Sequence, residues 1–196
     1  MGSAKTMPEL SELAESVRRR QEVLRAFLFA SGKTKKNNEP IMTATRMQKE
    51  IFLLQMETLY QREKLYEFVP PYYGPFSRDL AVDLATLTDN GSTIEDVEGI
   101  RLSPAGYNKA SRIWNSLDEK HQKSLITVKE KYNGLGTDNL LAYVYNKYPK
   151  FTTMSALRED VVNAYFDEFW ERNGLSAEYI VNAVRASRSS RNESGC

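Results

Sequence analysis

Apolar residues recur along the chain at intervals of three and four, which is the spacing of one face of an α-helix. The pattern predicts a series of helices, at 8–31, 43–61, 76–89, 104–117, 119–133, 137–148, 155–173 and from 176 onward. Between the third and fourth of these, residues 93–103 are short and strand-like and are flanked by turn residues, so we expect a two-stranded hairpin there. The fold class predicted is mainly α with one small β-hairpin.

Turn and capping residues divide the middle of the chain. Gly74 and Pro75 indicate a turn before the helix at 76–89, and Gly91 suits the left-handed residue that ends it. Ser103 followed by Pro104 is typical of an N-cap and a first helical residue. A helix, a hairpin and a helix in this order are the back half of a winged helix, with the hairpin as the wing and 76–89 in the recognition-helix position.

Three segments follow from this reading: an N-terminal helix and polar loop at 1–42, a winged-helix-like core at 43–117, and a C-terminal helical extension at 118–196. Apolar residues at helical spacing in the core segment are expected to be buried together; they are Met47, Ile51, Leu54, Leu80, Leu84 and Leu87. The first helix carries a stripe of its own, made of Leu10, Leu13, Val17, Leu24, Phe27 and Leu28.

Two stretches of the core segment carry a resemblance to a known family. One is a helix of the form (K/R)-Φ-Q-K-x-Φ-Φ-Φ-L, where Φ is apolar, and the other, about 20 residues later, is YYGP-(F/Y)-S-x-x-L-x-x-D-L-x-x-L. The matching residues are Arg46, Gln48, Lys49, Tyr73, Gly74, Pro75, Phe76, Ser77, Leu80, Asp83, Leu84 and Leu87. Over roughly 43–117 the chain resembles the Panacea (SocA-like) antitoxin domains and the related YwgA-like proteins. The resemblance implies a winged-helix-like regulatory protein whose relatives neutralise a toxin by direct contact.

Composition and charge narrow the class of protein. The 196 residues carry a formal net charge of +1, without the strong basic excess that is typical of nucleic-acid-binding domains. The single cysteine, Cys196, rules out a disulfide within the chain and fits a reducing compartment. No apolar run is long enough to span a membrane, and no apolar segment near the N-terminus resembles a signal peptide. We therefore expect a cytoplasmic protein.

Residues that could carry catalysis are scarce. His121 is the only histidine, and one His with a terminal Cys has neither the number nor the spacing of ligands for a metal site. His121 is therefore expected to be a solvated or packing side chain. The sequence has no glycine-rich phosphate loop. We expect no metal, no cofactor and no enzymatic activity.

The candidate binding residues lie in two groups. Arg18, Arg19 and Arg20 could contact phosphate or an acidic partner, or they could form a solvated helix face balanced by nearby glutamates. Tyr72, Tyr73, Ser77 and Arg78 surround the turn before the predicted recognition helix. The tyrosines could form a platform for a partner or pack inside the turn, and Ser77 and Arg78 could touch a phosphate backbone. Asp83 could point inward toward Lys49 or a backbone N–H, or it could be solvated.

The local charge bears on the choice of partner. Residues 72–103 contain two basic and six acidic residues, a net charge of −4 on the elements that should meet DNA. Affinity for phosphate comes from Lys and Arg, so this stretch is a poor DNA reader. The prediction is a non-enzymatic module that acts by protein–protein interaction, with a toxin as the partner that the resemblance implies. A DNA-binding transcriptional regulator is the alternative function, and the sequence is also compatible with a homo-oligomer.

Overall fold

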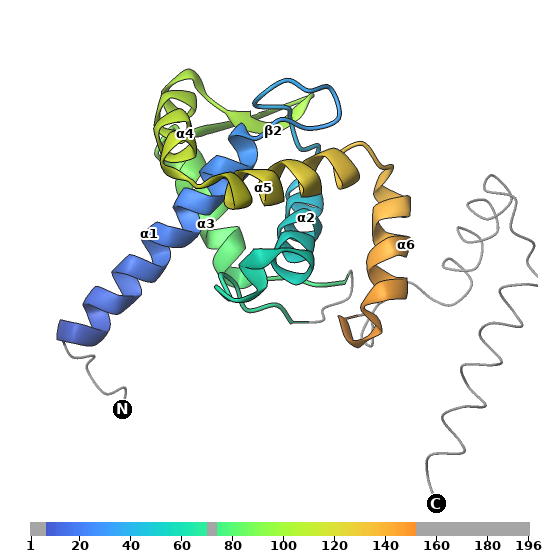
Figure 1. Cartoon of the computed structure of the whole chain (residues 1–196), viewed down its shortest axis with the longest axis horizontal. Coiled ribbons are helices and arrows are strands. Elements are labelled where there is room, and N and C mark those ends of the chain that lie inside the picture. The colour runs from blue at the N-terminus through green and yellow to red at the C-terminus, as the bar shows by residue number, and fades with distance from the viewer. Residues whose placement is uncertain (1–6, 70–73, 152–196) are drawn as a thin grey trace, which may run out of the picture. The chain divides into compact units, whose positions relative to one another are not determined.

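The computed structural model describes residues 7–69 and 74–151, all of which belong to one compact unit, Met1–Met154. These residues are mainly helical, with one small antiparallel sheet (Figure 1). The α-helices are α1 (Met7–Phe29), α2 (Ala44–Glu57), α3 (Arg78–Asp89), α4 (Pro104–Ser116), α5 (Glu119–Tyr132) and α6 (Thr137–Lys147). The strands are β1 (Thr93–Asp96) and β2 (Gly99–Leu102), and two short 3₁₀ helices are η1 (Leu59–Gln61) and η2 (Pro149–Phe151). The mainly α class is thus confirmed, while the helices predicted beyond 154 lie outside the described residues.

Side-chain caps fix where four of the helices begin. Thr43, Ser77, Ser103 and Asp118 each accept a hydrogen bond from the backbone N–H three residues ahead, which satisfies a donor that the helix itself leaves unpaired. The predicted cap at Ser103 is therefore confirmed. The helix predicted at 76–89 begins later, at Arg78, because Ser77 is its cap and Phe76 pairs with the backbone of Val69 instead.

The hairpin predicted within 93–103 is confirmed. β1 and β2 pair antiparallel, with Thr93 opposite Leu102 and Asp96 opposite Gly99. Ile41, from the loop before α2, exchanges both backbone hydrogen bonds with Ile100 and so extends the pairing beyond the hairpin. Gly99 has φ +118°, and a Cβ there would lie 2.5 Å from the carbonyl oxygen of Ile41, so this close approach requires glycine.

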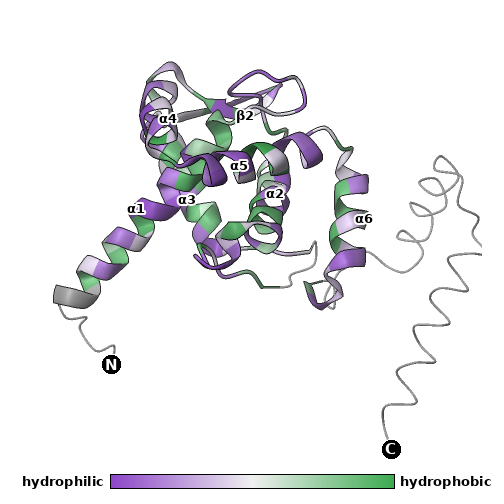
Figure 2. Cartoon of the chain, viewed as in Figure 1, coloured by the Kyte–Doolittle hydropathy of each residue, from purple (hydrophilic) through white to green (hydrophobic). Residues whose placement is uncertain are grey.

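Buried side chains from α1 to α6 and from β2 form one core, and hydrophobic residues, green in Figure 2, gather where these helices pack together. All six core residues predicted from α2 and α3 are buried: Met47, Ile51, Leu54, Leu80, Leu84 and Leu87. The stripe predicted along the first helix is correct only in its C-terminal half. Leu24, Phe27 and Leu28 are fully buried, whereas Leu10 and Leu13 are 46 and 43 % exposed. The apolar residues near the start of α1 therefore have no share in this core.

Helix α2 is the central element, because it is buried on all sides from Arg46 to Leu54. Its spacing of apolar residues predicted only one buried face. Polar side chains on the other faces are buried too, and each must find a partner inside the protein. The Arg46 guanidinium donates to the carbonyl oxygens of Tyr132 and Leu135 at 2.7 Å each, so it binds the C-terminal end of α5.

The interface between α2 and α5 contains a buried acid, Glu50 of α2, and a buried base, Lys129 of α5. Glu50 is fully buried 3.4 Å from the Arg46 Nε, and neither of its oxygens accepts a hydrogen bond from the described residues. Lys129 is fully buried and donates to the carbonyl oxygens of Leu28 and Ala30 at the end of α1. Burial raises the pKa of Glu50 to about 7 and lowers that of Lys129 to about 7, although their charges attract and oppose both shifts.

At the other end of α2, Glu57 collects hydrogen bonds from α5, α6 and the residue after α6. It accepts from the hydroxyls of Tyr132, Tyr143 and Tyr148 and from the ammonium of Lys147. Burial by itself would raise the pKa of Glu57, but the hydrogen bonds from Tyr132, Lys147 and Tyr143 outweigh it and lower the pKa to about 2. This carboxylate therefore ties α6 to α2.

Replacing Lys129 with Met should destabilise the protein most at high pH. The change leaves the carbonyl oxygens of Leu28 and Ala30 without the donor that Lys129 provides, and an unsatisfied buried acceptor costs about 1–3 kcal/mol. It also removes the ammonium whose charge opposes the rise in the pKa of Glu50. Without Lys129 the folded-state pKa of Glu50 rises further above its unfolded value, so the loss is smaller at pH 5, where Glu50 takes up a proton, than at pH 8. Urea denaturation at the two pH values measures the difference. Equal losses at both would contradict the coupling, and the exposed Lys123→Met on the same helix is the control.

Candidate functional site

A groove of about 660 Å³ lies between α2, α3 and β1. Its walls carry small side chains, because Ala44 comes from the start of α2 and Ala81 and Ala85 from α3. Phe76, 36 % exposed, also lines it, and Leu84 contributes an apolar side chain from the core. The remaining lining residues are Thr45, Gln48, Lys49, Gly74, Thr88, Asp89 and Glu95.

Two buried polar residues of α2 fix the turn that leads into α3. The Gln48 side chain donates from Nε2 to the Ser77 carbonyl at 2.9 Å and accepts the Ser77 N–H at 2.8 Å. The Lys49 ammonium donates to the Pro75 carbonyl at 3.0 Å, and burial lowers the pKa of Lys49 to about 8. Because these side chains bind backbone groups, the floor of the groove is held in place by α2 itself.

The rim of the groove is acidic. Asp89, at the end of α3, and Glu95, on β1, are exposed, and neither has an ion-pair partner among the described residues. Other acids of the same stretch are already neutralised, since Asp83 binds Arg20 at 2.8 Å and Asp96 binds Arg101 at 2.6 Å. The free negative charge of this face is therefore concentrated beside the groove.

The residues predicted for partner binding around the turn before α3 differ in their exposure. Ser77 is 1 % exposed and caps α3, so the expectation that it touches a partner is wrong. Arg78 is exposed on the first turn of α3, as a binding residue must be. Tyr72 and Tyr73 lie outside the described residues.

The three consecutive arginines of α1 have three different environments. Arg18 is exposed and pairs with Glu15 one turn away, in line with a solvated face. Arg19 binds Glu63 at 2.9 Å. Arg20 is only 9 % exposed and pairs with Asp83 of α3, so the prediction of a binding or solvated group is wrong for this residue. The inward position weighed for Asp83 is correct, with Arg20 rather than Lys49 as its partner.

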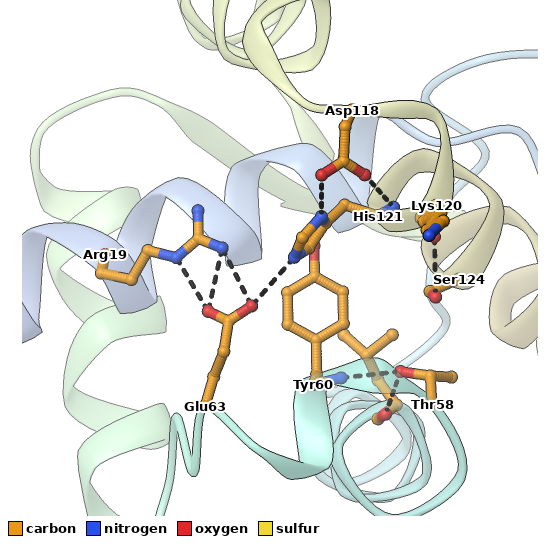
Figure 3. A network of polar contacts seen from close by, with 9 residues as sticks. Arg19, Thr58, Tyr60, Glu63, Asp118, Lys120, His121 and Ser124 are labelled. Carbon is orange, nitrogen blue, oxygen red and sulfur yellow. Dashed lines mark hydrogen bonds and ion pairs between the residues drawn. The ribbon is translucent and has the colours of Figure 1, made fainter.

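His121 is the centre of a polar network that joins three parts of the chain (Figure 3). Its Nδ1 lies 2.8 Å from the Asp118 carboxylate and its Nε2 lies 3.1 Å from that of Glu63, which Arg19 holds from the other side. The ring also packs edge-on against Tyr60 at 5.2 Å. His121 is thus a bridging residue rather than a solvated one. Its local partner, Asp118, is visible in the sequence, but Glu63 is 58 positions away and carries no local signal.

Comparison of the chain with models of protein families, with characterised proteins and with solved structures finds no match. Within residues 7–69 and 74–151, no three His, Cys, Asp or Glu side chains are grouped so that they could hold a metal ion. None of the helices in the described part of the chain combines the length and the apolar character that crossing a bilayer requires.

Two of the arginines in α1 provide a matched pair of substitutions. Arg20→Leu leaves the buried Asp83 carboxylate without its cation, so we expect a loss of about 3–5 kcal/mol in the free energy of unfolding. Arg18→Leu removes only an exposed pair and should cost less than about 1 kcal/mol. Chemical denaturation of both variants measures the two values. Similar losses for the two variants would show that Arg20 is not the structural cation described above.

Proposed function

We propose that the protein is a non-enzymatic, winged-helix-like regulatory module that acts by binding another protein. The antitoxin-like role implied by the resemblance of residues 43–117 belongs to this proposal. In a winged-helix reading, α3 stands in the recognition-helix position, the β1–β2 hairpin is the wing, and the pairing of Ile41 with Ile100 supplies the short third strand. A toxin is then the natural class of partner.

The acidic groove beside α3 is the observation that carries the proposal. A surface that reads duplex DNA needs Lys and Arg facing the phosphates. Here Asp89 and Glu95 are the exposed charges at the groove, and they would repel a phosphate backbone. An apolar floor with an acidic rim is better suited to a protein surface that combines apolar and basic side chains.

The alternative, a DNA-binding transcriptional regulator, rests on Arg78. This residue is exposed at the N-terminal end of α3, where backbone N–H groups and the helix dipole favour phosphate oxygens. It supplies one contact, whereas affinity for duplex DNA usually comes from several.

A titration of labelled random duplex DNA, followed by fluorescence anisotropy at two salt concentrations, separates the two functions. We expect binding near or weaker than about 10⁻⁴ M, the weak end of non-specific affinities, because the groove face repels phosphate. Replacing Asp89 with Asn and Glu95 with Gln should then strengthen DNA binding if DNA approaches this face, and leave it unchanged otherwise.

The opposite result would favour the regulator. Sub-micromolar binding by the wild-type chain, with a steep dependence on salt and a loss on Arg78→Ala, would reject protein binding through this face. Lys109→Ala, which removes an exposed cation from α4, is the control for the loss of one positive charge.

A further inference from the structure

We propose that the groove between α2, α3 and β1 binds one amphipathic, positively charged helix of a protein partner. The inference rests on the proposed function and makes it specific, since it names both the surface and the chemistry of what covers it. It follows from the shape of the groove, from how its polar groups are used and from the charges at its rim.

The walls allow close approach of a helix. Ala44, Ala81 and Ala85 present only methyl groups along α2 and α3, so the two walls leave room between them for the side chains of a partner. An amphipathic helix binds such a groove by inserting apolar side chains at positions i, i+3, i+4 and i+7.

The floor favours apolar contacts. The Gln48 amide both donates to and accepts from the Ser77 backbone. Lys49 is 3 % exposed and donates to the Pro75 carbonyl. These groups are committed to holding α3 in position. Phe76, by contrast, is a partly exposed aromatic ring of the kind that anchors interfaces.

The rim selects the charge of the partner. Asp89 and Glu95 lie on two different elements and both line the groove, so a helix within it passes close to both carboxylates. Lys or Arg on the flanks of that helix would be attracted to them, whereas Asp or Glu would be repelled. A basic amphipathic helix therefore matches the floor and the rim together.

Selection from a display library of random helical peptides tests the inference with the full-length chain as bait. Ala85→Trp, which fills the groove from an exposed position, serves as bait in a parallel selection. We expect peptides retained by the wild-type chain alone to combine an apolar stripe with an excess of Lys and Arg. The inference is overturned if the two baits retain the same peptides, or if the peptides retained by the wild type have no basic excess.

Anisotropy titrations with one labelled selected peptide then test the contacts. Ala85→Trp should weaken its binding by about tenfold or more, as should the double change Asp89→Lys and Glu95→Lys, which preserves the groove and reverses its rim. The controls Ala105→Trp on α4 and Glu119→Lys on α5 change exposed residues elsewhere and should alter the affinity less than about twofold. Equal affinities for the wild type and both groove variants would refute the proposed docking.

Three further outcomes show whether this inference fails alone or together with the function on which it rests. If analytical ultracentrifugation finds a dimer that Ala85→Trp converts to monomer, the occupant is a second copy of the chain and the inference is wrong. If no groove-dependent peptide emerges and DNA binding is also absent, the groove inference fails while protein binding through another surface stands. If peptides fail and tight, Arg78-dependent DNA binding is found, the proposed function fails as well.

Discussion

A central helix that is buried on every side forces its polar residues to find partners within the protein, and the arrangement of the other helices depends on those partners. Nine consecutive residues of α2, Arg46–Leu54, are buried. A buried polar group without a partner costs about 1–3 kcal/mol, and more if it is charged. Arg46 therefore reaches the end of α5, Gln48 the start of α3, and Lys49 the turn before it. Each bond fixes one neighbour relative to α2.

Two glutamines on α2 use the same device. Gln48 donates to and accepts from the backbone of Ser77, and Gln55, seven residues on, does the same with Tyr66. Each side-chain amide thereby makes the two hydrogen bonds that a neighbouring strand would make to the backbone of one residue outside the helices and strands. The segment between these two points leads from α2 to α3, so its two ends are anchored on one helix. The position of α3, and with it the groove, follows from this anchoring.

The charged side chains of this region fall into two groups: buried ones that pair with each other and stabilise the fold, and exposed ones that a partner could contact. Asp83 and Arg20 form a buried pair between α3 and α1, and their net effect on the surface is small. Asp89 and Glu95 remain exposed at the groove. A count of charges along the sequence treats Asp83, Asp89 and Glu95 alike, which is why the net value of −4 for residues 72–103 suggested an acidic face without locating it.

Local features could be predicted from the sequence, and distant partners could not. Ser103, Asp118 and Gly91 act within a few residues of themselves, so their roles as caps and helix ends are encoded locally. The pairing of Arg20 with Asp83 spans 63 positions, and a triple arginine gives no sign of which member will be buried. Gln48 and Lys49, two of the residues that carry the family resemblance, donate hydrogen bonds to the carbonyls of Ser77 and Pro75, which belong to the same pattern. This part of the pattern therefore describes how the turn before α3 is held.

Amide hydrogen exchange in variants of the two glutamines tests the central claim that α2 holds α3 through its buried side chains. Gln48→Leu should speed exchange at the start of α3, around Ser77 and Leu80, and leave the backbone of Tyr66 protected. Gln55→Leu should do the reverse, because its two hydrogen bonds go to Tyr66. If both variants loosened both segments equally, or if Gln48→Leu left the start of α3 as protected as in the wild type, the account of α2 as the element that positions the groove would be wrong.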